Sequence, residues 1–74
     1  MDEIMKIMPA LIAAEAQDAM KYANLALTYR VDNPDLADMF RELSGQELHH
    51  MQMISDKLAG MVNALHDQYR PSEL

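Results

Sequence analysis

The sequence predicts an all-α fold in which two antiparallel helices form a hairpin. Three features of the 74-residue chain support this: helix-forming residues dominate it, it contains only two glycines, and an Asn-Pro pair divides it near its middle. Ala, Leu, Met, Glu, Gln and Lys have high helix propensities, whereas Gly and Pro interrupt helices. A hairpin of this size buries too little apolar surface to be comfortably stable alone, so we expect it to form an oligomer or to bind a metal.

The first helix is expected over about residues 3–30 and the second over about residues 34–59, separated by a turn at residues 31–33. Asn33 is a favourable N-cap, and Pro34 suits the first helical position because its missing N–H has no helical partner there. Because only about three residues separate the helices, they must fold back on each other as an antiparallel hairpin.

Two residues leave the helix boundaries open. Pro9 lacks a backbone N–H and clashes with the preceding turn, so it predicts either a kink in the first helix or a main helix that starts there. Gly60 has a low helix propensity, so the second helix either continues through it or is followed by a short C-terminal helix over about residues 61–69. No internal repeat is visible, and we expect a single domain.

The charge and the composition disfavour several classes of partner. Twelve acidic against six basic residues give a net charge of −6, which disfavours nucleic acids and anionic membranes and suits cations. No apolar segment approaches the roughly 20 residues that cross a bilayer, and acidic residues stand at the N-terminus where a secretory signal has basic ones. We therefore expect a soluble cytoplasmic protein. Cysteine is absent, which excludes disulfides and thiolate metal ligands.

Glutamate and histidine side chains fall within the apolar faces of both expected helices. At about 100° per residue, Glu15 lies in the apolar stripe of the first helix and Glu47 lies at the centre of the stripe of the second. His50 is one turn from Glu47 and converges with it, whereas His49 points away. The stripe residues that accompany Glu15 are Ile4, Met8, Leu11, Tyr22, Ala26 and Tyr29, and those that accompany Glu47 are Leu36, Phe40, Leu43, Met51, Ile54, Leu58, Met61 and Leu65.

An antiparallel hairpin places three polar residues at one level. Glu15 lies about as far before the turn as Glu47 and His50 lie after it, so two carboxylates and an imidazole share one buried layer. A lone core histidine is more often a hydrogen-bonded structural residue, but buried carboxylates without compensation are costly. Glu15, Glu47 and His50 are therefore predicted to bind a metal cation.

The segments that carry these residues resemble the rubrerythrin branch of the ferritin-like di-iron proteins. "EAQDAMKY" is similar to a first-helix signature in which a tyrosine follows the metal-binding glutamate by seven residues, and "DLADMFRELSGQELHH" is similar to a second helix that ends in Glu-x-x-His. The resemblance implies that Glu15 is a terminal carboxylate ligand, Glu47 a bridging carboxylate and His50 an imidazole ligand. Tyr22 either hydrogen-bonds a ligand carboxylate during catalysis or fills the core as an aromatic residue.

The chain contains one copy of this half-motif, whereas a ferritin-like four-helix bundle contains two. The resemblance therefore implies a homodimer that completes the bundle and holds two iron ions, with manganese as the other candidate metal. This arrangement is similar to the two-helix encapsulated ferritins, whose dimers form rings within a protein nanocompartment. A ring of dimers is the second assembly that we expect, although the final "YRPSEL" does not resemble a cargo-targeting tail.

The function implied by this resemblance is iron oxidation. We expect a subunit-shared di-iron site that binds Fe²⁺ and reacts with O₂ or peroxide, as a ferroxidase or a peroxide-reducing protein in iron storage or oxidative stress. Two alternatives stay open: a non-catalytic module that binds or carries metal with the same ligands, and a metal-free helical hairpin that dimerises or binds a partner helix. The sequence names no electron donor.

Overall fold

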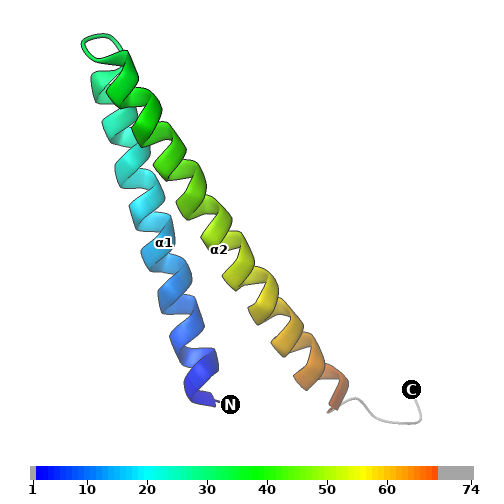
Figure 1. The fold of residues 1–74 in the computed structure, drawn as a ribbon. Coiled ribbons are helices and arrows are strands. Elements are labelled where there is room, and N and C mark those ends of the chain that lie inside the picture. The colour runs from blue at the N-terminus through cyan, green and yellow to red at the C-terminus, as the bar shows by residue number, and fades with distance from the viewer. Residues whose placement is uncertain (1, 69–74) are drawn as a thin grey trace.

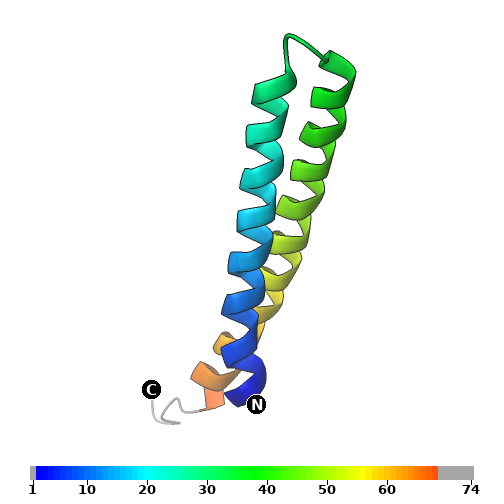
Figure 2. The ribbon, with the colours of Figure 1, turned by 90° about the vertical axis from the view of Figure 1, so that its left-hand side faces the viewer.

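The computed structural model describes residues 2–68 and confirms an all-α two-helix hairpin. Helix α1 spans Asp2–Tyr29 and helix α2 spans Pro34–Gln68, and they run antiparallel along one shared seam (Figures 1 and 2). No third element packs on either helix within residues 2–68, so this seam is the one interface inside the described chain. Neither of the two described helices is apolar over a length that could span a bilayer.

The turn between the helices is closed by hydrogen bonds of Asn33, the predicted N-cap. Its side-chain Oδ1 accepts from the backbone N–H of Leu36 at 3.2 Å, which satisfies one of the free donors at the start of α2. Its own N–H donates to the carbonyl of Tyr29 at 2.9 Å, and its carbonyl accepts from the N–H of Ala37 at 3.0 Å. Local hydrogen bonds thus fix where the chain reverses.

Both helices extend past the residues that were expected to interrupt them. α1 begins at Asp2, seven residues before Pro9, so the alternative of a main helix that starts at Pro9 is wrong. α2 continues through Gly60 to Gln68, because one interior glycine costs only about 1 kcal/mol and helix-forming residues flank it. No separate third helix therefore forms within the described chain, and residue 69, the expected end of that segment, lies outside it.

Small residues line the seam between α1 and α2. The most buried side chains are those of Ala37, Ala19, Ala26, Met8 and Ser44, each at most 9% exposed. Because four of these five are Ala or Ser, the helices approach closely, but little apolar area is removed from water. Many large apolar side chains stay exposed, namely Ile4, Ile7, Leu11, Met20, Leu27, Tyr29, Val31, Met39, Leu48, Met53 and Val62. Of the predicted stripe, the α2 residues are half-buried, whereas Ile4, Leu11 and Tyr29 of α1 are exposed, so the single hairpin buries the stripe only in part.

An aromatic cluster holds the seam together near the turn. The ring of Phe40 on α2 stacks on the rings of Tyr22 and Tyr29 on α1, with centroid separations of 6.2 Å and 6.1 Å. The Nζ atom of Lys21 lies 5.0 Å from the centroid of the Tyr22 ring, within range of a cation–π contact. This cluster lies between the turn and the level of Glu15. Its stacked rings pack α1 against α2 in the antiparallel alignment that the turn sets.

Candidate metal centre

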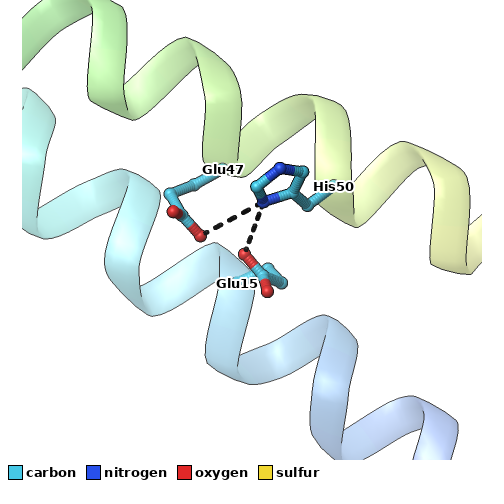
Figure 3. Close-up of side chains that lie close together, drawn as sticks. All are labelled: Glu15, Glu47 and His50. Atoms are coloured by element: carbon cyan, nitrogen blue, oxygen red, sulfur yellow. Dashed lines mark ion pairs between the residues drawn. The ribbon is translucent and has the colours of Figure 1, made fainter.

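Two carboxylates and one imidazole converge at the seam, about midway along α1 (Figure 3). Glu15 projects from α1, and Glu47 and His50 project from α2. The Nδ1 atom of His50 lies 3.6 Å from Oε2 of Glu15 and 3.8 Å from Oε2 of Glu47. One potential ligand atom from each residue lies within 4.8 Å of the other two. The hairpin therefore brings together the three residues that the helical phase and the turn position predict.

The site is more open than the sequence pattern predicts. The side chains of Glu15 and Glu47 are 26% and 20% exposed, and that of His50 is 51% exposed. The expectation of a buried layer is therefore wrong for the single hairpin, because two helices share only one seam and cannot enclose residues that lie beside it. The imidazole of His50 forms the open edge of the site.

One carboxylate oxygen in the site lacks a partner. Oε2 of Glu15 is buried and has no hydrogen-bond donor within the described residues. The Nδ1 atom of His50, at 3.6 Å, is too far away for a normal hydrogen bond. Buried carboxylate oxygens are almost always hydrogen-bonded or paired with a cation, and this one faces the space between the two ligand groups of α2. A cation bound in that space would satisfy it.

The pKa of Glu47 is raised above its ordinary value of 4.5. The largest cause is Glu15, because a protonated Glu47 can share a hydrogen bond with that carboxylate, and partial desolvation and the negative charge of Glu15 act in the same direction. His50 opposes the rise through its charge and through hydrogen bonding. Once Glu47 is ionised it has no proton to donate, which leaves Oε2 of Glu15 unpaired. A metal ion at this position would take the place of the shared proton.

The donor set fits a first-row divalent metal. Carboxylate oxygen and imidazole nitrogen atoms are common ligands of iron, manganese and zinc ions, and all three donors here can face one point. A two-metal carboxylate site in a helical bundle uses a glutamate from each of two helices and a Glu-x-x-His pair from each of the other two. Each hairpin carries one glutamate and one such pair, which is half of that set.

The other residues considered from the sequence lie outside the cluster. Tyr22 is half-buried and its ring packs on Phe40, but no hydrogen bond joins its hydroxyl to Glu15 or Glu47 within residues 2–68. Its catalytic role stays a prediction. His49 is exposed and does not belong to the cluster.

A polar residue that the sequence pattern did not single out lies one turn from the site. Ser44 on α2 is buried, and its hydroxyl donates a 2.7 Å hydrogen bond to the backbone carbonyl of Ala19 on α1. In the described part of the chain, this is the one side-chain hydrogen bond that joins the two helices. The signal in the sequence is a serine three positions before Glu47, on the side of α2 that faces the seam.

An apolar groove follows the seam beside Ser44. Its larger part has a volume of about 480 Å³ and is lined mainly by small and aliphatic side chains, including Ala23, Leu27 and Leu48. A smaller part of about 280 Å³ adjoins it. None of the three candidate ligands lines either part, so the groove is separate from the metal site.

Comparison with known protein families identifies the family of the chain. The rubrerythrin family matches over residues 6–73, a range that includes Glu15, Glu47 and His50. Neither the curated proteins nor the solved structures gave a significant match. The geometry of the three side chains agrees with the family match, because they form the kind of donor set that an iron site requires. The chain therefore belongs to the rubrerythrin family and carries a candidate metal site consistent with the iron site of that family.

Proposed function

We propose that this protein is a homodimeric di-iron protein that oxidises Fe²⁺ with O₂ or peroxide at a site shared by two chains. The observation that carries the proposal is the half-site on each hairpin, in which Glu15, Glu47 and His50 converge and a buried oxygen of Glu15 has no donor within the described residues. Two such half-sites provide four carboxylates and two imidazoles, the ligand set of a ferritin-like di-iron site.

The exposed apolar residues beside the site support the dimer. Ile4 and Leu11 share a helix face with Glu15, and they are 53% and 46% exposed. A second hairpin packed on this face would cover them and complete a four-helix bundle. The same contact would bring two half-sites together and enclose the open edge at His50. One dimer interface would therefore bury exposed apolar residues and also complete the ligand set.

The ligands have distinct roles in this proposal, as membership of the family implies. Glu15 would be a terminal carboxylate ligand, Glu47 a bridging carboxylate, and His50 a neutral imidazole ligand whose Nδ1 lies near both carboxylates. The four carboxylates of the dimer balance the charge of two Fe²⁺ ions, so the enclosed layer is neutral only when it is loaded. The iron supplies the redox chemistry toward O₂ or peroxide, and the chain supplies the ligands and limits the access of water.

Anaerobic titration of the metal-free protein with Fe²⁺ tests the proposal. We expect one Fe²⁺ per chain, followed by rapid oxidation with repeated turnover when O₂ or peroxide is added. Glu47→Ala and His50→Ala should abolish tight binding, whereas His49→Ala, which removes the neighbouring exposed imidazole, should leave it intact. Equal losses at the two histidines would show that the ligand assignment is wrong.

The same titration identifies the alternative functions. Tight binding of one Fe²⁺ per chain without repeated turnover would indicate a module that binds or carries iron. A chain that binds neither Fe²⁺ nor Mn²⁺ would be a helical interaction protein instead. A parallel titration with Mn²⁺ at the same pH gives the relative affinities and so shows which ion the site selects.

A further inference from the structure

We propose that Ser44 is a positioning residue of the metal site, whose hydroxyl fixes α1 against α2 so that Glu15 meets Glu47 and His50. The inference rests on the proposed function and deepens it, because it concerns what holds the ligands in place before metal binds. It starts from the one side-chain hydrogen bond that crosses the seam in the described part of the chain.

The link and the ligands are close together on both helices. Ser44 is three residues before Glu47 on α2, and its acceptor Ala19 is four residues after Glu15 on α1. At 1.5 Å of rise per residue, the hydrogen bond lies about 4.5–6 Å along the helices from Glu47 and Glu15. Figure 3 shows that the site is split between the helices, so the placement of α1 relative to α2 sets how far Glu15 lies from the other two ligands.

The hydrogen bond from Ser44 to Ala19 is short and buried, so it can set the position of α1 relative to α2. Its length is 2.7 Å, and Ser44 and Ala19 are 9% and 5% exposed, so the hydrogen bond is largely shielded from solvent although Ser44 also borders the groove. A serine inside a helix often donates to a carbonyl of its own preceding turn, whereas Ser44 donates across the seam. The alanines around it pack closely, but the hydrophobic effect that favours their burial is non-directional. Ser44 therefore supplies the directional contact nearest to the site.

The ligand distances explain why a small slide matters. Nδ1 of His50 lies 3.6 Å from Glu15 and 3.8 Å from Glu47. Metal–ligand bonds of about 2.0–2.2 Å bring neighbouring ligand atoms to roughly 3 Å from one another, so the metal-free site is already close to a binding geometry. A slide of α1 would change the distance from Glu15 to His50 but not the spacing of Glu47 and His50, which share α2. Loss of the Ser44 hydroxyl should therefore weaken the contribution of Glu15.

Variants at position 44 separate the hydroxyl from the shape of the side chain. Ser44→Ala and Ser44→Val remove the hydroxyl, whereas Ser44→Thr keeps it at a position that borders the groove. Ser55→Ala is the matched control, because Ser55 is a half-buried serine of the same helix that lies farther from the ligands.

Co²⁺ serves as the probe, since its visible spectrum reports the ligands as well as the affinity. We expect Ser44→Ala and Ser44→Val to bind Co²⁺ about tenfold more weakly with an altered spectrum, and Ser44→Thr and Ser55→Ala to match the unmodified chain.

A second comparison removes the effect of stability. Thermal unfolding of the metal-free samples is followed by circular dichroism, and Leu65→Ala, at a half-buried position far from the site, serves as a variant of lowered stability. We expect Leu65→Ala to bind Co²⁺ normally. A Ser44→Ala protein with unchanged Co²⁺ affinity and spectrum would overturn the inference, and so would a failure of Ser44→Thr to restore them. An unmodified chain that binds no Co²⁺ would overturn the proposed function and this inference with it.

Discussion

Glu15 and Glu47 face each other across the seam, and His50 is the one side chain of residues 2–68 that forms an ion-pair contact with either of them. This contact stabilises the pair only while His50 is protonated. In the metal-free chain, a proton held by Glu47 relieves the repulsion, which raises the pKa of that group. A metal ion bound at this candidate site would therefore compete with a proton for the same carboxylates.

The raised pKa of Glu47 predicts how the stability of the metal-free protein depends on pH. A carboxyl group with a folded-state pKa above its unfolded value of 4.5 contributes stability that is fully present below that value and is lost as the pH rises through the raised pKa. Glu47→Gln keeps the hydrogen-bonding side chain but cannot ionise, so this loss should disappear. Melting temperatures in the presence of a chelator, measured from pH 4 to pH 8, check the prediction.

Glu42→Gln is the control for this prediction, because Glu42 is an exposed glutamate on the same helix. Its melting curve should follow that of the unmodified chain over the whole pH range. If Glu47→Gln also followed the unmodified chain, the two carboxyl groups would not be coupled in the metal-free protein.

The uninterrupted course of α2 is the main result at the scale of secondary structure. The helix extends for 35 residues, and Gly60 lies inside it. A Cβ atom added at Gly60 would meet no atom within 4 Å, so no contact inside the hairpin requires a glycine there. The C-terminal part of α2 thus depends on helix propensity more than on packing.

Gly60→Ala should therefore stabilise the protein by roughly 1 kcal/mol, because alanine has the higher helix propensity and fits without a clash. Gly60→Pro should destabilise it by about 3 kcal/mol, because proline breaks a helix at an interior position. Urea unfolding followed by circular dichroism measures both. A break in α2 at residue 60 would instead make the alanine variant neutral and the proline variant tolerated.

At the scale of the whole molecule, the described hairpin leaves much of its apolar surface exposed. Its buried residues are mostly small, and its large apolar residues are widely exposed. An exposed apolar surface of this kind normally marks an interaction site. Leu11 lies on the face of Glu15, whereas Leu27 lies about 120° around α1 from Glu15, so substitutions at these two positions distinguish the site face from another exposed face of the same helix.

Light scattering of the unmodified chain should therefore report a dimer or a multiple of it. Leu11→Glu should favour the monomer, because it places a charge in the proposed interface beside the metal site. Leu27→Glu adds the same charge to another exposed leucine of α1 and should leave the dimer intact. A stable monomer of the unmodified chain at micromolar concentration would contradict the shared-site proposal.

Metal should couple the assembly to pH. Binding requires ionised carboxylates and a neutral imidazole, so Fe²⁺ or Mn²⁺ should raise the melting temperature near pH 7 and have little effect near pH 4. The shift is measured by scanning calorimetry with and without metal at both pH values. His50→Ala should lose the shift near pH 7, and an equal metal effect at both pH values would argue against carboxylate ligands.

The sequence alone determined the helices, the turn and the members of the cluster. Asn33 and Pro34 mark the reversal through local hydrogen bonding and a fixed backbone angle, which depend on neighbouring residues only. Once the turn position is known, the helical period places Glu15, Glu47 and His50 at one level, and the structure brings them together. Pro9 and Gly60 could not be resolved in this way, because their local penalties of a few kcal/mol or less compete with the propensity of the residues around them.

Only the tertiary structure decided how open the site is and which contact aligns the helices. Helical phase predicted a buried layer, but His50 is half exposed, because burial depends on how many helices surround a residue and the hairpin has two. The hydrogen bond from Ser44 to Ala19 joins residues 25 positions apart, so helical phase can place Ser44 on the seam but cannot identify its acceptor. The sequence therefore specified the ligands through short-range periodicity, whereas their exposure and their alignment depend on distances between helices that only the packed structure defines.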